Sequence, residues 1–547
     1  MPDRSSVSKE NSALPDRAMK WLLAGERETR WLRLALMLAA ALYFMCLAVT
    51  GTVPINRYGN DALVLLDGGW RLLNGQIPYR DFYLALGPLE FMVTAFGMFF
   101  THDSPQGIAI GTAAFGMIVG LWGWLLARRC MPTVPALIVT VWLIVTATSP
   151  TPLGHPWSVI SCGMIYNRQG YALLGLVLVE CAFASECSRF WGGVSSGVAL
   201  VLLAFLKLNF FGAALLLLLV TVPVRRDEMQ RSWGILAGTA CTVTAFILYL
   251  RFAVFAFLSD MAFAIHARAS TLKIGGMIAD LAGNAEIVAL AVIAMAVTIM
   301  ASGARPWQRH GARLILLGCI VIATASMLKE TNAFDTGFQL VTLWIAILVG
   351  QLAAAYPRAN EKTAIVAVVA LGLATIAADF LLSAGSVVTL MRYNSPSVRS
   401  TGASLAANGM ERLKFYDPEV PDAASSIDSS RFYVVCVNDG LALLRRSSAP
   451  DESVLTLGFH NPFSYLLRRK PALGGSPFLL LGNSMAETHL LDTDRVFGNA
   501  SLIMVPHYPS SHQKSDTALD KAYHAYLFQH FAFVASSQYW SLYRRIR

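Results

Sequence analysis

Long uncharged stretches are the feature that most restricts how this chain can fold. Between residues 31 and 383, apolar runs follow one another closely, and several, such as 287–304 and 341–357, contain no charged residue. A helix needs about 20 apolar residues to cross the hydrocarbon core of a bilayer. Only 14% of the 547 residues are charged, against about 25% in an average soluble domain. The sequence therefore predicts a polytopic α-helical membrane protein and argues against a soluble enzyme, a fibrous protein or a disordered one.

The apolar segments determine how many crossings we expect. The candidate spans are 31–53, 84–100, 108–127, 133–150, 170–187, 190–206, 208–224, 234–257, 285–303, 313–328, 337–355 and 362–383. Basic loops stay on the cytoplasmic side, and two full crossings between residue 84 and Arg128 would place Arg128-Arg129 outside. We therefore interpret 84–100, which contains Glu90, as a juxtamembrane or re-entrant helix. About eleven spans remain, and because a missed span elsewhere would satisfy the same rule, we expect about 11–13 transmembrane helices.

Basic residues also orient the chain and divide it. We expect a cytoplasmic basic tail (1–30), a transmembrane domain (31–383) whose first external loop is 54–83, and an extracytoplasmic soluble domain (384–547). The net charge of +9 is typical of Lys and Arg retained at the cytoplasmic ends of helices. We therefore expect membrane lipids and no nucleic acid among the partners. The pattern fits a multi-pass protein of a bacterial inner membrane, with a cytoplasmic N-terminus.

From residue 384 onward the apolar runs shorten and polar residues become common. Short apolar runs predict strands, and two longer segments, 461–469 and 518–531, predict helices. The predicted strands are 431–437, 453–459, 478–482, 501–507 and 531–537. Strands that alternate with helices indicate a small α/β domain with a partly parallel sheet. The histidines of this region show no metal-ligand spacing.

The first external loop concentrates charged residues beside a predicted amphipathic helix. Apolar residues at helical spacing predict that 61–74 is a helix at the membrane interface, ended by Gly75. A carboxylate here can act as a general base, and an arginine can bind a lipid-linked phosphate; alternatively, the charges only solvate the helix. The charged residues are Asp61, Asp67, Asp81, Arg57, Arg71 and Arg80.

Several motifs follow one another in an order that resembles a known enzyme class. An acid soon after the first span is followed by a short helix, by G-x-x-P-Y-R-D-F at 75–82 and by G-P-L at 87–89. YNRQGYALLG at 166–175 and KLNFFGAALLLL at 207–218 come next, and an extramembrane domain ends the chain. The pattern is similar to the GT-C class of membrane glycosyltransferases, in particular to bacterial relatives of dolichyl-phosphate-mannose protein mannosyltransferases and to aminoarabinose transferases.

The resemblance implies a GT-C-like fold and a catalytic base in the first external loop. Asp61 occupies the place of that base, with Asp67 and Asp81 as alternates. The family pattern is an Asp-Glu pair, whereas this chain has Asp61-Ala62. Candidates to bind the donor phosphate are Arg57, Arg80, Arg168 and Lys207. Candidates to bind the rest of the substrate are Tyr79, Tyr166, Asn167 and His266.

The leading hypothesis is an inverting glycosyltransferase that transfers a sugar from a polyprenyl-phosphate donor to an envelope acceptor (a glycan, lipid or protein) on the extracytoplasmic face. No nucleotide-binding fingerprint is present, which agrees with a lipid-phosphate leaving group. No cofactor is required, and the sequence neither demands nor excludes a divalent metal. The alternatives are a transporter or flippase of a lipid-linked substrate, which predicts internal repeats, and a non-catalytic membrane scaffold.

Overall fold

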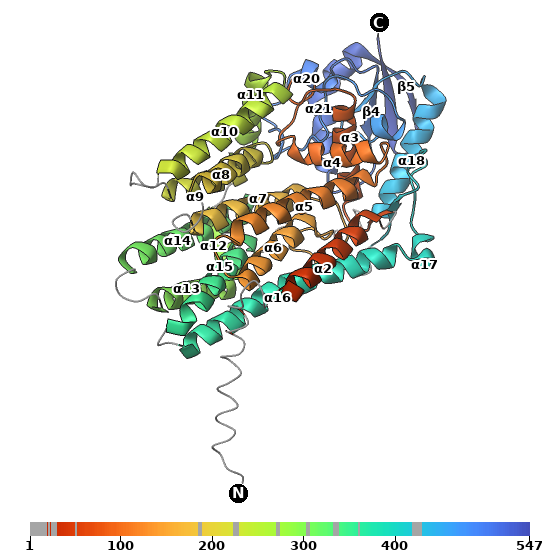
Figure 1. Ribbon diagram of the computed structural model, residues 1–547. Helices are drawn as coiled ribbons and strands as arrows, with labels where there is room; N and C mark the ends of the chain where they lie inside the picture. The colour runs from red at the N-terminus through yellow and green to blue at the C-terminus, as the bar shows by residue number, and fades with distance from the viewer. Residues whose placement is uncertain are drawn as a thin grey trace.

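The computed structural model describes residues 19, 22, 30–49, 52–183, 189–221, 229–269, 274–301, 307–331, 338–358, 362–417 and 429–546. It is a polytopic α-helical membrane protein with a C-terminal α/β domain at one end of the helical bundle (Figure 1). α3 (Gly59–Leu73) and α4 (Leu89–Phe100) lie between the bundle and that domain. The remaining helices up to residue 393 are α2 (Arg30–Val49), α5 (Gly107–Ala127), α6 (Thr133–Thr148), α7 (Ile165–Ala182), α8 (Arg189–Ala204), α9 (Leu208–Val220), α10 (Met229–Tyr249), α11 (Val254–Ala269), α12 (Ile274–Gly283), α13 (Ala285–Ala301), α14 (Trp307–Thr331), α15 (Gln339–Ala355), the 3-10 turn η2 (Tyr356–Arg358) and α16 (Lys362–Tyr393).

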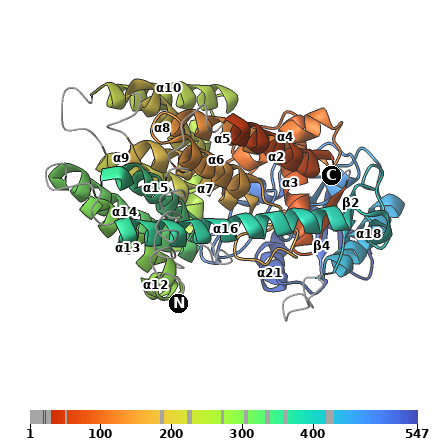
Figure 2. The same cartoon turned by 60° about the horizontal axis from the view of Figure 1, so that its bottom comes forward.

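The predicted spans coincide with helices, but many helices are short. Within the described residues, four helices are long and apolar enough to cross a membrane, in α5, α10, α14 and α16. α12 and α13 add a fifth if this pair, bent by 75°, counts as one span. Seven further apolar helices have 10–17 residues. Among them α4 has 12 residues and cannot cross a bilayer core alone, as expected for the segment interpreted as juxtamembrane or re-entrant. α16 is the longest and continues to Tyr393, alongside α2 (Figure 2).

One predicted loop is helical. No span was predicted between 257 and 285, so we expected this segment to be a loop, but its described residues form α11 and α12. Within α11, the carboxylate of Asp260 is paired with Arg495 of the C-terminal domain at 2.8 Å. Because a distant partner neutralises it, this acid is compatible with a helix that is otherwise rich in apolar residues.

A buried ion pair and a glycine contact hold α7, α8 and α10 together. Arg231 donates to both oxygens of Glu180 at 2.6 Å, and Ser196 donates to the same carboxylate at 3.0 Å. Nearby, a Cβ added at Gly197 would lie 2.3 Å from the carbonyl oxygen of Ile235. Only glycine permits two helix backbones to approach this closely, as in other membrane helix pairs. Glu180, an acid inside an apolar helix, therefore has a structural partner.

α3 is buried rather than interfacial. We expected one apolar stripe on a membrane-surface helix, but Val64 and Leu65, outside that stripe, are buried as well. The reason is that α4 packs on one side of α3 and the C-terminal helices on another, so no broad face remains exposed. The end of the helix is as predicted, since Gly75 has the left-handed φ of 78° that favours glycine.

The C-terminal domain contains a four-stranded sheet in the order β3-β4-β6-β5. β3 and β4 are parallel, whereas β4 pairs with β6 and β6 with β5 in antiparallel fashion. Helices α18 and α21 pack against this sheet. The elements are α17 (Pro396–Arg399), β2 (Leu413–Phe415), α18 (Ser430–Ser447), β3 (Val454–Thr456), α19 (Phe463–Leu466), α20 (Thr493–Phe497), β4 (Leu502–Pro506), α21 (Gln513–His530), β5 (Phe531–Ser536) and β6 (Trp540–Arg545).

Three of the five predicted strands are confirmed, as β3, β4 and β5. The strand expected at 431–437 is wrong, because this segment begins α18, whose N-cap Ser429 accepts a hydrogen bond from the amide of Phe432. Tertiary packing of the helix overrides the strand propensity of its apolar residues. The segment 478–482 forms only isolated bridges, and β6 was not predicted.

A small second sheet connects the segment before α3 to the C-terminal region. β1 (Val53–Ile55) pairs in parallel with β2, with Val53 opposite Leu413. Asn56 continues the connection: its side chain donates to the carbonyl of Ser158 at 2.7 Å and accepts from the amide of Ile160 at 2.8 Å. The start of α3 is therefore fixed between the loop before α7 and the C-terminal domain.

Candidate functional site

A cavity of about 420 Å³ opens where the bundle, the start of α3 and the C-terminal domain meet. This volume lies within the usual range for small-molecule sites. Four segments line it: residues 57–65 at the start of α3, Leu86 and Glu90 at the start of α4, residues 162–166 before α7, and side chains of the C-terminal domain. The C-terminal residues are Phe459, Phe478, Leu480, Asn483, Ser511 and His512.

Asp61 is the predicted base that lines this cavity. It lies in the first turn of α3, where the helix dipole favours a negative charge. Tyr58 precedes the helix with a left-handed φ of 54° and accepts a hydrogen bond from the Asp61 amide at 3.1 Å. A Cβ added at Gly163 would lie 2.9 Å from Asp61 Oδ2. The carboxylate therefore lies close to the backbone at Gly163, where a larger residue would displace it.

Glu90 is a second carboxyl group in the same cavity, and it was not among the predicted site residues. The residue is 4% exposed, and Oε2 has no hydrogen-bond partner among the residues that the structure describes. Burial and the nearby charge of Asp61 raise the pKa of Glu90 to about 8, against the opposing charge of Lys207. An acid within the apolar run 89–100, directly after Gly-Pro-Leu, was the sequence signal that could have identified it.

A close backbone contact fixes Glu90 relative to Lys207. The amides of Gly87 and Leu89 each donate at 3.0 Å, to the carbonyls of Leu206 and Phe205 respectively. A Cβ at Gly87 would lie 1.8 Å from the carbonyl oxygen of Phe205, so this position requires glycine. The beginning of α4 therefore packs directly on the turn that carries Lys207.

Two of the predicted phosphate-binding cations belong to this region. Arg57 lines the cavity, and its guanidinium is 5.2 Å from the centroid of the Tyr58 ring. Lys207 is buried; its Nζ donates to Asn167 Oδ1 at 3.2 Å and lies 5.0 Å from the centroid of the Tyr166 ring. Tyr166 lines the cavity. The structure thus brings Arg57, Tyr166, Asn167 and Lys207 together around Asp61 and Glu90.

The C-terminal domain supplies an aromatic wall. The rings of Phe459 and His512 are stacked at 3.9 Å with an interplanar angle of 13°. Asn60 Nδ2, next to Asp61, lies 3.4 Å from His512 Nε2. Asp516 accepts a hydrogen bond from the Phe459 amide at 2.7 Å, and burial raises the pKa of Asp516 to about 7. No sequence pattern connects this region with Asp61, which lies about 400 residues or more earlier.

The alternate bases, Asp67 and Asp81, are paired with arginines elsewhere. Asp67 and Arg71 form a fully buried ion pair at 2.9 Å. Asp81 accepts from Arg80 at 2.8 Å and from the amide of Ile77 at 2.7 Å. Burial raises the pKa of Asp81, but these hydrogen bonds outweigh it and hold the pKa below its ordinary value. Neither carboxylate lines the cavity.

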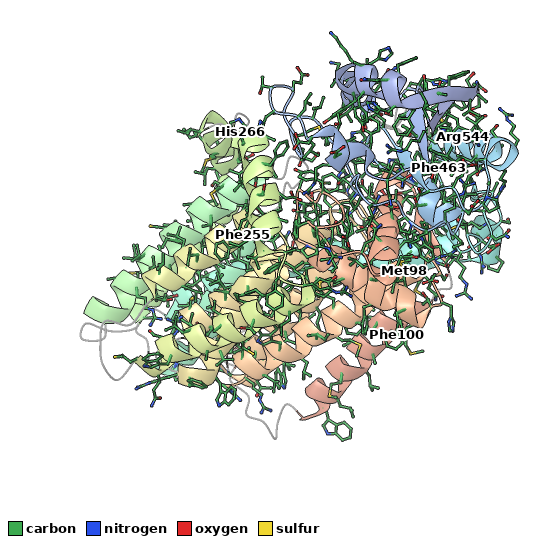
Figure 3. The ribbon with its side chains drawn as sticks, turned by 90° about the horizontal axis from the view of Figure 1, so that it is seen from above. Met98, Phe100, Phe255, His266, Phe463 and Arg544 are labelled. Atoms are coloured by element: carbon green, nitrogen blue, oxygen red, sulfur yellow. The ribbon has the colours of Figure 1, made fainter. Side chains whose placement is uncertain are left out.

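The other predicted residues also lie away from Asp61. Tyr79 is fully buried and donates to the carbonyl of Leu86 at 2.9 Å. Arg168 donates to the carbonyl of Thr151 at 2.6 Å and lines a separate cavity of about 350 Å³. His266 is exposed on α11, with its ring 5.2 Å from that of His489 (Figure 3). Within the described ranges, no group of three or more His, Cys, Asp and Glu side chains is placed to hold a metal ion.

No protein-family model and no curated protein matches the sequence. Among solved structures, the chain is similar to ArnT from Cupriavidus metallidurans bound to undecaprenyl phosphate, with 14% identity, a TM-score of 0.49, and 95% of this chain and 98% of that chain covered. The apo form of the same protein gives 13% identity and a TM-score of 0.42 over the same shares. Because both TM-scores are below 0.5, we base the functional proposal on the cavity itself.

Proposed function

We propose that this protein is an inverting glycosyltransferase of the GT-C class, which transfers a sugar from a polyprenyl-phosphate donor to an acceptor of the cell envelope. The observation that supports this most strongly is the composition of the cavity of about 420 Å³. It combines a carboxylate at a helix N-terminus, cations beside it, and apolar walls, at the junction of a membrane bundle and a polar domain.

The charge and polarity of the cavity suggest which residues bind the lipid-phosphate donor. Arg57 and Lys207 carry positive charge, and arginine and lysine are the usual partners of a phosphate in proteins. Val64, Leu65 and Ile165 line the same cavity and provide an apolar surface for the first isoprene units next to that phosphate. Tyr166, in contact with Lys207, offers its ring to the sugar. The apolar and cationic parts together suit a sugar linked to a lipid through one phosphate.

The reaction needs one base. The Asp61 carboxylate removes the proton of the acceptor hydroxyl, and the acceptor oxygen attacks the anomeric carbon opposite the phosphate. The bond from that carbon to the phosphate oxygen breaks, and the configuration inverts. The leaving group is already a phosphate ester, so the proposal requires no nucleotide or other cofactor. Asp61 was predicted from its place in the first external loop, and it remains our candidate because it lines the cavity.

The arrangement in the membrane is part of the proposal. The tail 1–30 would be cytoplasmic, 31–383 would form the transmembrane domain of an inner-membrane protein, and 384–547 would lie outside. In this orientation the cavity faces the extracytoplasmic side, between the first external loop and the C-terminal domain. A lipid-linked donor could then enter from the bilayer and an envelope acceptor from the aqueous side.

The test is a comparison of envelope glycans and glycolipids by mass spectrometry in a strain that lacks the protein. The strain is complemented with the wild type, with Asp61→Asn, or with Asp451→Asn, an exposed acid outside the cavity. We expect one sugar modification to disappear without the protein, to return with the wild type and Asp451→Asn, and to stay absent with Asp61→Asn at equal membrane levels. Restoration by Asp61→Asn would refute Asp61 as the base. An unchanged sugar profile in all strains would refute the transferase proposal.

A further inference from the structure

Glu90 is a buried acid for which the residues that the structure describes provide no ion pair. Asp67 is paired with Arg71, and Asp260 with Arg495. Glu90 is 4% exposed, lines the cavity, and keeps Oε2 without a partner. A buried acid without an ion pair is most stable in its neutral form, with its proton available to a ligand oxygen. A ligand in the cavity is the obvious acceptor for that proton.

Two carboxyl groups in one cavity can divide the roles of acid and base when their surroundings differ. Asp61 lies at a helix N-terminus and is partly exposed, which favours the charged form. Glu90 lies in an apolar helix start that is packed against the turn at Lys207. The pKa of Glu90, raised to about 8, agrees with this division.

On the basis of the proposed transferase function, we propose that Glu90 is the general acid that protonates the departing lipid phosphate while Asp61 deprotonates the acceptor. Lys207, close to Glu90, would hold the phosphate in reach of that proton.

Every bond and proton of the proposed sugar transfer can be accounted for. The acceptor O–H bond breaks and its proton goes to Asp61; the acceptor oxygen forms a bond to the anomeric carbon. The bond from that carbon to the phosphate oxygen breaks, and its electron pair stays on the phosphate. The phosphate takes the proton of Glu90. The products are the glycoside, a monoprotonated polyprenyl phosphate, a neutral Asp61 and a charged Glu90. Proton exchange with water, through the open side of the cavity, restores both groups.

Binding of undecaprenyl phosphate to the full-length protein in lipid nanodiscs tests the proposed role of Glu90. The experiment requires no knowledge of the sugar or the acceptor. Above pH 7.5 a phosphate monoester has lost its second proton, because its second pKa is about 6. Binding to neutral Glu90 then requires one proton, so the wild-type affinity should fall about tenfold per pH unit above the pKa of Glu90. Glu90→Gln should make the affinity independent of pH between about 8 and 9.5, and Asp451→Asn should behave as the wild type.

Other titratable groups face the same space, and the design separates them. Those that line the cavity are Arg57, Tyr58, Asp61, Cys162, Tyr166 and His512, and the charge of Lys207 acts on Glu90 from beside it. Burial raises the pKa of the Cys162 thiol to about 12, above the pH range of the experiment. Lys207→Arg keeps the positive charge at all these pH values. The Lys207→Arg variant should therefore keep the pH dependence of the affinity. Loss of this pH dependence in the variant would overturn the assignment to Glu90.

The outcomes distinguish this inference from the proposed function. A wild-type affinity that does not change with pH, or a Glu90→Gln variant that keeps the wild-type dependence, would overturn the role of Glu90 alone. Absence of undecaprenyl phosphate binding at every pH would count against the proposed function as well. In the glycan assay we expect Glu90→Gln to reduce transfer by about 10²–10⁴-fold, the usual contribution of a general acid, and wild-type transfer by this variant would overturn the inference.

Discussion

Arg71→Met should destabilise the attachment of the C-terminal domain to α3, because it leaves a buried carboxylate without its partner. The side chains of Asp67 and Arg71 are 0% exposed and form an ion pair at 2.9 Å. Arg71 Nη1 also donates to the carbonyl of Gly474 at 3.0 Å, and so links α3 to the loop before α20. Since that domain forms one wall of the cavity, the pair helps to shape the candidate site.

The size of the effect follows from burial. Removal of one member of a buried ion pair costs about 3–5 kcal/mol, whereas replacement of both by apolar residues is often nearly neutral. Asp67 Oδ1 and Arg71 Nη2 make no hydrogen bond, so the wild-type pair is incompletely satisfied and the double variant Asp67→Leu/Arg71→Met should recover most of the loss. Burial raises the pKa of Asp67 even with Arg71 beside it. In the single variant this carboxyl should be protonated on acidification, so its destabilisation should be smaller at pH 5 than at pH 8.

Thermal unfolding of the purified protein in detergent, together with limited proteolysis of the C-terminal domain, measures both effects. We expect the order wild type, double variant, Arg71→Met in decreasing stability, with the gap between the last two closing as the pH falls. Equal stability of the single and double variants at pH 8, or a larger loss at pH 5 for Arg71→Met, would refute this reasoning.

Further predictions follow from other contacts. Burial raises the pKa of Asp516 to about 7 in the folded protein, so the native state binds more protons than the unfolded state between about pH 4 and 7. Stability should therefore decrease as the pH rises through this window. Thermal unfolding of Asp516→Asn should depend less on pH than that of the wild type. Gly197→Val should lower the free energy of unfolding by about 1–3 kcal/mol, because its Cβ would lie 2.3 Å from the Ile235 carbonyl oxygen. Thermal unfolding should show a greater loss of stability for this variant than for Gly212→Val, where an added Cβ meets nothing within 4 Å. Alkaline phosphatase fused at residue 546 should be active if the C-terminal domain lies outside, as proposed, and inactive if it lies in the cytoplasm.

The membrane bundle could be predicted from the sequence because long apolar runs depend on local composition alone. The ends of α5, α8 and α15 agree with the predicted spans to within a few residues. The helices at 258–269 and 274–283 were not predicted, and the packing of the first depends on contacts absent from the local sequence, such as the ion pair of Asp260 with Arg495, more than 200 residues later. The prediction of a strand at 431–437 failed for a similar reason, since a cap at Ser429 and tertiary packing determine α18.

Some residues of the candidate site could likewise be predicted from the sequence, and others could not. Asp61 was proposed because the resemblance to GT-C enzymes implies a base in the first external loop, and Lys207 and Tyr166 were proposed as cationic and aromatic residues of segments expected to face outward. Glu90 was missed because the expected second acid was sought next to Asp61, at Ala62, whereas the structure brings a carboxyl group from the following helix. Its placement depends on the contact of Gly87 with Phe205, which joins segments more than 100 residues apart.

The central claim is that the cavity at Asp61 binds a polyprenyl phosphate, and photo-crosslinking tests it most directly. A polyprenyl phosphate with a photoreactive group in its first isoprene unit is irradiated with the full-length protein, and the labelled peptides are identified by mass spectrometry. We predict labels within residues 57–65 and 162–166 that decrease with excess undecaprenyl phosphate. Labels confined to other segments, or labels that the excess lipid does not reduce, would contradict the claim.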